Sequence, residues 1–214
     1  MDTAEKVAKI LLDIKAITFN AQKPFQYASG ILSPVYTDCR LLLGYPKERT
    51  EIRDLYIEAM QSGGQKFDVI AGTATAGIPH AAWIADKLNL PMLYVRGKAK
   101  DHGKGNQIEG VLKQGQNVAV IEDLISTGES SAGAVNTIRQ AGGIAPNIFS
   151  IITYGMQKSI ENFSANNITL SSLTNFATVV AVAQTEGYIK KEDQQIILDW
   201  TTDPAGWGTK MATK

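Results

Sequence analysis

Short apolar runs alternate along most of the chain with segments of helical periodicity. The runs have the length and composition of buried parallel strands, and they lie at residues 67–71, 91–95, 118–121 and 144–153. The periodic segments place apolar side chains on one stripe of an amphipathic helix, and they lie at residues 4–17, 46–62, 80–88 and 130–141. This alternation predicts an α/β fold with a central, mostly parallel sheet flanked by helices.

The pattern near the amino terminus is less regular than in the centre of the chain. Residues 25–27 and 35–37 predict two short strands, joined by a bend at residues 28–34 that contains Gly and Pro. We expect these peripheral elements, near residues 1–40, to form a small hood over the main sheet.

The last third of the chain also lacks clear apolar runs after residue 153. We expect two helices there, at residues 174–183 and 190–200, that cover one edge of the sheet. Residues 204–214 are expected to be a loosely held terminus. No linker or internal repeat divides the chain, so we predict a single domain, residues 1–214.

Residues 118–131 combine a buried strand, two acids and a hydroxyl-rich, glycine-containing turn that leads into a helix. Such a turn opens at the carboxyl end of a parallel strand, where doubly wound sheets bind ligands. The backbone N–H groups of residues 126–130 and the positive end of the helix predict an anion cradle. Glu122 and Asp123 would repel a phosphate, so we expect them to bind sugar hydroxyls or a bridging cation. The expected ligand is a sugar phosphate.

Common nucleotide-binding motifs do not explain this turn. No Lys follows its glycine, as a P-loop requires, and no G-x-G-x-x-G opens a helix after a strand. The alternative is an ordinary strand-to-helix turn with an N-cap serine and solvated acids.

Two further loops have the composition of ligand-binding segments. Residues 72–79 form a glycine- and threonine-rich turn between a strand and a helix, which predicts a second anion cradle. Residues 96–110 are polar and glycine-rich and carry several basic side chains, which is typical either of a mobile lid or of a solvated charged loop. These basic side chains are Arg96, Lys98, Lys100 and Lys104.

Composition restricts the class of protein. The chain has 214 residues, 44% of them hydrophobic, and no apolar run is long enough for a membrane helix. Equal numbers of basic and acidic residues, 21 each, argue against general nucleic-acid binding. The single cysteine, Cys39, excludes an internal disulfide, and its apolar neighbours predict a packed thiol. Acids at positions 2 and 5 are unlike a secretory signal, so a cytoplasmic location is expected.

Three motifs together resemble one enzyme family. The segment Glu-Asp-Leu-Ile-Ser-Thr-Gly at residues 122–128 resembles the phosphoribosyl pyrophosphate (PRPP) motif of type I phosphoribosyltransferases. The segment Lys-Asp-His-Gly at residues 100–103, about 20 residues earlier, is similar to the loop of the orotate phosphoribosyltransferase family. Residues 29–38 resemble that family's amino-terminal region, which lies over the base-binding pocket.

This resemblance implies a type I phosphoribosyltransferase fold and transfer of the phosphoribosyl group from PRPP to orotate, in pyrimidine (UMP) biosynthesis. It implies Lys100, His102, Glu122 and Asp123 as catalytic residues, and Ser126 and Tyr36 as orotate contacts. The implied PRPP-binding residues are Arg96, Lys100, His102, Glu122, Asp123, Leu124, Ile125, Ser126, Thr127, Gly128, Glu129, Ser130, Thr73 and Ala74.

The resemblance also implies a cofactor and an assembly. Mg²⁺ would bind through substrate oxygens, with no protein ligand assigned to it. The implied partners are PRPP and orotate, with no nucleic acid and no membrane. A homodimer is implied, in which the lid at residues 96–110 closes over the neighbouring subunit's active site.

The chain departs from the family pattern at several positions. Ala28 and Ala76 stand where some relatives have Lys. Gly97 also stands where many relatives have Lys, and Lys98 at the next position could supply the missing charge. No Arg occurs around residues 154–157, where relatives have the Arg that contacts the orotate carboxylate. The sequence therefore does not identify the residue that binds this carboxylate.

Two alternatives share the phosphate cradle. A phosphoribosyltransferase for another base, such as a purine, should lack the Lys-Asp-His-Gly segment. A non-catalytic PRPP-sensing regulator would normally add a nucleic-acid-binding element, and the sequence contains neither a helix-turn-helix extension nor a basic stripe.

Overall fold

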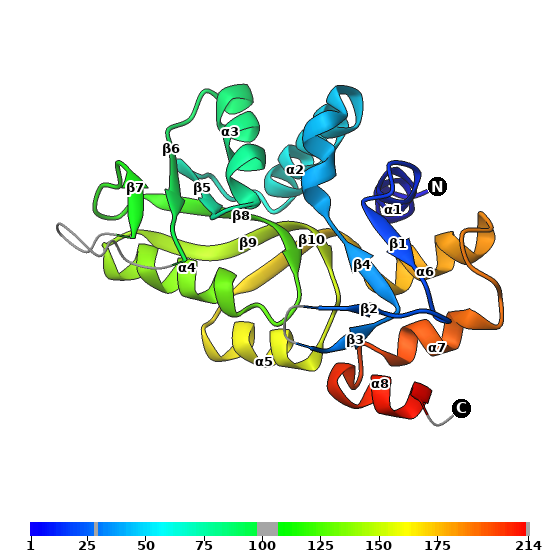
Figure 1. Cartoon of the computed structure of the whole chain (residues 1–214). Coiled ribbons are helices and arrows are strands. Elements are labelled where there is room, and N and C mark those ends of the chain that lie inside the picture. Colours follow the sequence, from blue (N-terminus) through cyan, green and yellow to red (C-terminus); the bar gives the residue numbers. More distant parts are fainter. Residues whose placement is uncertain (28–29, 98–106, 213–214) are drawn as a thin grey trace.

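The computed structural model describes residues 1–27, 30–97 and 107–212, with side chains as far as residue 208. The strands of its main sheet are β5 (Val69–Thr73), β6 (Met92–Val95), β7 (Ile108–Gly110), β8 (Asn117–Ile125), β9 (Ile144–Thr153) and β10 (Thr169–Asn175). They lie in the order β10-β9-β8-β5-β6-β7 (Figure 1). All neighbours pair in parallel except β6 and the edge strand β7. The prediction of a central, mostly parallel sheet is confirmed.

Helices cover both faces of the sheet, because its central strands are apolar on both faces. In β8, Ala119 and Ile121 belong to the core cluster that includes residues of three helices, α1 (Thr3–Asp13), α2 (Pro46–Ser62) and α3 (Gly77–Leu88). Val118 and Val120 point the other way, into the cluster formed with α4 (Glu129–Gln140) and α5 (Gln157–Ala165). The period-two alternation of a strand therefore divides the core into two layers.

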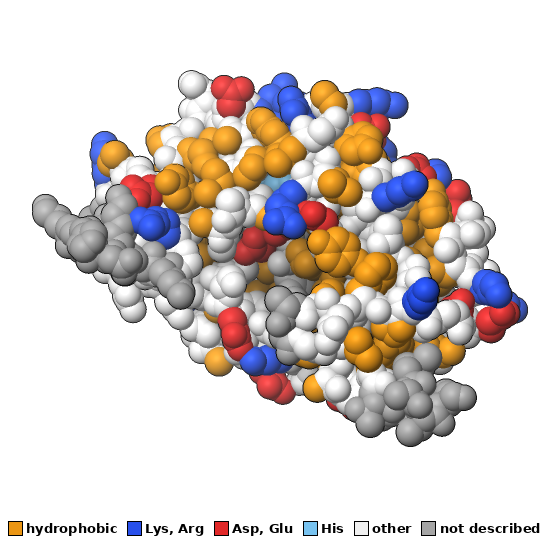
Figure 2. All heavy atoms as spheres, viewed as in Figure 1, with side chains coloured by type: hydrophobic (Ala, Val, Ile, Leu, Met, Phe, Trp, Pro, Cys, Tyr) orange, Lys and Arg blue, Asp and Glu red, His pale blue; other side chains and the backbone are white. Residues whose placement is uncertain are grey.

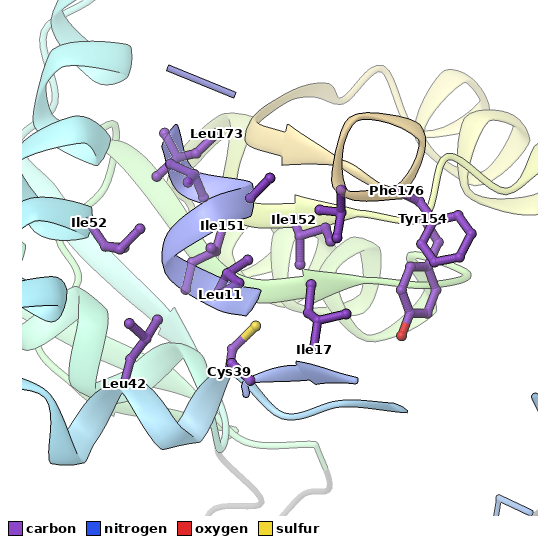
Figure 3. Packing of buried hydrophobic residues seen from close by; sticks show 14 of the residues in the cluster. Leu11, Ile17, Cys39, Leu42, Ile52, Ile151, Ile152, Tyr154, Leu173 and Phe176 are labelled. Atoms are coloured by element: carbon purple, nitrogen blue, oxygen red, sulfur yellow. The ribbon is translucent and has the colours of Figure 1, made fainter. Parts of the chain in front are cut away.

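The hood consists of two small antiparallel pairs and the short helix η1 (Cys39–Gly44). The first pair is β1 (Ile17–Phe19) with β4 (Val35–Thr37), and the second is β2 (Phe25–Gln26) with β3 (Leu32–Ser33). Ile17 of β1 and Cys39 of η1 point into the core, to which Tyr154 also belongs (Figure 3). The predicted packed thiol is confirmed, because Cys39 is buried.

The carboxyl-terminal helices complete the fold around an aromatic cluster. They are α6 (Phe176–Thr185), α7 (Asp193–Asp199) and α8 (Pro204–Ala212). Trp200 is fully buried, packs edge-on against Tyr27 and Tyr154, and donates a hydrogen bond from Nε1 to the Leu32 carbonyl oxygen at 3.1 Å. This tryptophan therefore joins the end of the chain to the hood.

One prediction about the amino-terminal part was wrong. The helix expected at residues 4–17 ends at Asp13, because Lys15 adopts a positive φ of 58° and Ile17 begins β1. The strands expected near residues 25 and 35 are confirmed as β2 and β4, and each pairs with another strand of the hood.

The helices expected at residues 174–183 and 190–200 are confirmed as α6 and α7, with bounds shifted by a few residues. Helix α5 and strand β10, which precede them, were not expected, and the prediction for the tail was wrong. The expected loose tail is helix α8, in which buried Trp207 donates from Nε1 to the Ile196 carbonyl oxygen at 2.8 Å. Among the described helices, none combines the length and apolar content needed to cross a membrane.

Candidate functional site

A cleft of about 280 Å³ lies where β5 and β8 end at the same edge of the sheet. Its walls come from the turn after β5 and from the end of β8 with its following turn. The lining residues are Ala74, Thr75, Ala76, Glu122, Asp123, Leu124, Ser126, Thr127, Gly128, Glu129, Ser130 and Ser131. Both segments that were predicted as anion cradles therefore face one cleft.

The turn from β8 into α4 has the geometry of an anion site. Gly128 is the N-cap of α4 with a φ of 74°, and a Cβ atom there would meet the Phe163 ring at 2.7 Å. The N–H groups of the first turn of α4 have no acceptor within the helix, and the helix dipole makes this end positive. The predicted arrangement of strand, turn and helix is confirmed.

Helix α5 supports this turn from outside the sequence motif. Asn162 donates from Nδ2 to the Thr127 carbonyl oxygen at 2.8 Å, and Lys158 forms an ion pair with Glu129. Helix α5 was not expected from the sequence, because Ile160 and Phe163 are its main apolar side chains. These supporting residues were therefore missed.

The two acids occupy opposite faces of β8. Glu122 is buried against α4, where Ser131 Oγ donates to its Oε2 at 3.0 Å and the Asp123 backbone N donates to its Oε1 at 3.2 Å. The hydroxyl of Tyr56 on α2 donates to the Glu122 carbonyl oxygen at 2.6 Å. These contacts hold the end of β8, and with it the acid pair, in a fixed position.

Burial changes the protonation of the pair. It raises the pKa of Glu122 from 4.5 to about 8, and the charge of neighbouring Asp123 adds to the shift. Burial also raises the pKa of Asp123, against the opposing effect of hydrogen bonds and of the Arg40 charge. The pair therefore carries less than its full negative charge at neutral pH, which reduces its repulsion of an anionic substrate.

This pKa shift predicts a dependence of stability on pH. Between pH 4.5 and about 8 the folded protein holds a proton on Glu122 that the unfolded chain releases, so the free energy of unfolding should fall as pH rises through this window. Glu122→Gln removes the titrating group and should make the fall shallower. Urea denaturation at several pH values measures both slopes. Equal slopes in the two proteins would contradict the assignment.

The turn after β5 forms the opposite wall of the cleft. The backbone of Gly77 lies so close to the Ile121 carbonyl oxygen that no Cβ atom would fit between them. The peptide bond between Ala74 and Thr75 is cis. Thr73 is buried, and its Oγ1 atom has no hydrogen-bond partner among the described residues.

Thr73 also lines a second hollow, of about 250 Å³, which shares Ala74, Glu129 and Ser130 with the cleft. Arg96, at the end of β6, lines this hollow and forms an ion pair from Nη1 to Glu109 Oε1 at 3.6 Å. The two hollows therefore adjoin, and the second one contains the basic side chain of Arg96.

The predicted lid is described only at its two ends. Lys100 and His102 lie outside the described residues, as do Lys98 and Lys104. The loop is also shorter than predicted, because Ile108–Gly110 forms β7. This strand pairs with β6 and is the edge strand of the sheet.

Two of the predicted contact residues lie outside the cleft. The Ile125 side chain is buried in the core, so it does not line the cleft. Tyr36 is 44% exposed and its ring packs against Phe25, with 5.7 Å between centroids, outside both hollows. Ser126 does line the cleft, and its Oγ lies 3.7 Å from the sulfur of Met156.

Met156 follows β9, at the place where relatives would supply an Arg. It is buried, and its thioether offers no charge to a carboxylate. His80, which the sequence assigned to a helix rather than to catalysis, lies on α3 and packs against Tyr56 and Trp83. Neither residue supplies a basic group to the cleft.

Comparison with known proteins places the chain in a family. Residues 42–144 match the phosphoribosyl transferase domain. The chain is 47% identical to the orotate phosphoribosyltransferase of Coxiella burnetii, over 97% of this chain and 99% of that protein. It is 48% identical to the corresponding protein of Listeria monocytogenes, over 97% and 100%.

Solved structures agree with these sequence relatives. The orotate phosphoribosyltransferase of Aeropyrum pernix superposes with a TM-score of 0.73 and 29% identity, over 86% of this chain and 99% of that one. The Leishmania donovani UMP synthase superposes with a TM-score of 0.77 and 25% identity, over 92% of this chain and 42% of that one. The chain has the type I phosphoribosyltransferase fold and belongs to the orotate phosphoribosyltransferase family.

Proposed function

We propose that the protein transfers the 5-phosphoribosyl group of PRPP to orotate, giving orotidine 5′-phosphate (OMP) and pyrophosphate, in the route to UMP. The observation that carries this proposal is the single cleft in which an acid pair lies between two anion-binding turns. A substrate with phosphates at both ends of a ribose matches that arrangement. Nearly full-length identity to relatives named for orotate favours orotate over a purine.

In the proposed complex, each wall of the cleft binds a different part of PRPP. The N-terminus of α4 and the turn at residues 126–130 bind the 5′-phosphate, while the turn at residues 73–77 and the adjoining hollow with Arg96 receive the pyrophosphate. Between them, Glu122 and Asp123 accept hydrogen bonds from the ribose hydroxyls. The charge of Asp123 also favours the positive charge that develops on the ribose as the bond to pyrophosphate breaks.

Catalysis in this arrangement is mostly electrostatic and positional. Lys100 and His102, together with Arg96, would offset the charge of the leaving pyrophosphate and exclude water when the lid closes. Mg²⁺ supplies further positive charge to the pyrophosphate when it is bound. We propose that this Mg²⁺ would be held mainly by substrate oxygens, because Mg²⁺ commonly needs few protein ligands.

We also propose a homodimer that shares its lid. Leu41 and Leu43 on η1 and Tyr45 before α2 are exposed apolar side chains at alternate positions along the chain. A twofold contact through this surface would bury them and would bring the partner subunit close to the hood. We also propose a cytoplasmic location, as expected from the sequence.

The choice of base is tested with purified protein, PRPP and Mg²⁺. Separate incubations with orotate, uracil, adenine, guanine and hypoxanthine should release pyrophosphate rapidly only with orotate. The acceptor that gives the largest kcat/KM identifies the substrate, with heat-denatured protein as the control. Preferential turnover of a purine would reject the proposed reaction.

A further inference from the structure

Arg40 and Asp38 form an ion pair with two hydrogen bonds at the edge of the hood, and we call this pair the fork. Asp38 Oδ1 accepts from Arg40 Nε at 2.6 Å, and Asp38 Oδ2 accepts from Arg40 Nη2 at 2.9 Å. Two parallel bonds of this kind hold the guanidinium in one plane. The Nη1 group and one Nη2 hydrogen remain available to another anion. The Arg40 side chain is 62% exposed, so a ligand can reach these donors.

The fork lies on the Asp123 side of β8. Cys39, between the two fork residues, is buried in the same cluster as Ile121, and strand alternation places Asp123 on the face of Ile121. The pKa of Arg40 is raised first by its hydrogen bond to Asp38, and the charges of Tyr36 and Asp123 add to this effect. Arg40 is therefore close enough to the acid pair for the charges to interact.

The surroundings of the fork suit a planar carboxylate. Orotate is a flat pyrimidine ring that carries a carboxylate, and this charge would be repelled near Glu122 and Asp123 without a neighbouring cation. The exposed ring of Tyr36 offers a flat apolar surface beside Arg40. Figure 2 shows a face of the molecule on which acidic and basic side chains gather beside hydrophobic ones.

Other described cations near the cleft are engaged elsewhere. Lys158 pairs with Glu129, and Arg96 pairs with Glu109 beside the second hollow. Buried Met156 occupies the segment after β9 and has no charge. Arg40 is thus the described cation that combines an oriented guanidinium, free N–H groups and a position on the Asp123 side of the strand.

We propose that Arg40, positioned by Asp38, binds the carboxylate of orotate and so determines specificity for this base. The inference rests on the proposed function, because it assumes that orotate lies beside the acid pair. It assigns a residue for carboxylate recognition in a chain that has no Arg after β9. Asp38 is the positioning residue, since it acts through the guanidinium that it holds.

Calorimetry with OMP and UMP isolates this contact, because the two nucleotides differ only in the carboxylate. Wild-type protein should bind OMP more tightly than UMP. Arg40→Gln should weaken OMP binding roughly 10- to 100-fold, as expected for loss of a hydrogen bond between charged groups, and should leave UMP binding unchanged. Asp38→Asn should weaken OMP binding in the same direction but less. Arg40→Lys keeps the positive charge but not the planar guanidinium, so its affinity for OMP should lie between those of wild type and Arg40→Gln.

Arg53→Gln is the matched control, because Arg53 also pairs with an adjacent acid, Asp54, but lies on α2 away from the cleft lining. Its affinities should equal those of wild type. Retained UMP binding shows that the Arg40 variant is folded.

Three results would overturn the assignment of Arg40. The first is that Arg40→Gln loses affinity for OMP and UMP equally, and the second is that it loses affinity for neither. The third is a selective loss of OMP in Lys158→Gln instead, which would move carboxylate recognition to α5. If wild-type protein makes no OMP from orotate and PRPP, the proposed function fails and this inference fails with it. If wild type makes OMP and Arg40→Gln keeps its preference for OMP over UMP, only the inference about Arg40 is wrong.

Discussion

Asp123→Asn is expected to lower kcat by roughly 100- to 1,000-fold, the range observed when one preorganised electrostatic contact to a transition state is removed. The amide keeps the shape of the side chain but cannot offset positive charge on the ribose. Because burial raises the pKa of Asp123, the charged side chain does not stabilise the fold, so the free energy of unfolding should not decrease. Steady-state kinetics with PRPP and orotate, together with urea denaturation, measure the two effects separately.

Asp86→Asn is the matched control for this change, because Asp86 is exposed on α3 and does not line the cleft. Its kcat should equal that of wild type. Wild-type turnover in Asp123→Asn would remove this carboxylate from the proposed mechanism.

Hybrid dimers are expected to recover activity from two inactive parents. If the lid acts in the neighbouring site, a dimer of one Lys100→Ala subunit and one Asp123→Asn subunit has both lesions in one site and none in the other. Its rate should be about half that of the wild-type dimer, if the twofold-related sites act independently. Two different affinity tags allow the hybrids to be purified before the assay.

The control is a hybrid of two differently tagged Lys100→Ala subunits, which should stay inactive. Verified mixed hybrids that are as inactive as their parents would show that the lid does not act across subunits. A protein that stays monomeric in solution would contradict the proposed assembly itself.

The central layers of the fold could be predicted because local signals and tertiary structure agree there. Helix α2 has the predicted bounds, with Pro46 in its first turn and Gly63 after its end. Strand β9 also has the predicted bounds, because its apolar run is continuous. The turn at residues 126–130 was recognised because a glycine, hydroxyl side chains and a following helix occur together in the sequence.

Strand β10 and helix α8 could not be predicted, because contacts between distant residues stabilise them. Strand β10 is rich in Ser and Thr and pairs with β9 as an edge strand, so it shows no apolar run. Helix α8 contains Gly206 and Gly208, which disfavour a helix, yet burial of Trp207 against α7 holds it in place. Arg40 gave no signal as a site residue, because only the folded hood brings it beside Asp123.

The most direct test of the central claim is to follow the reaction by phosphorus NMR with wild-type protein, PRPP, Mg²⁺ and orotate. We expect PRPP to disappear while OMP and pyrophosphate form in equal amounts, and we expect neither product when orotate is omitted. Loss of PRPP to ribose 5-phosphate without OMP, or no loss of PRPP under conditions in which the protein is folded, would contradict the proposed reaction.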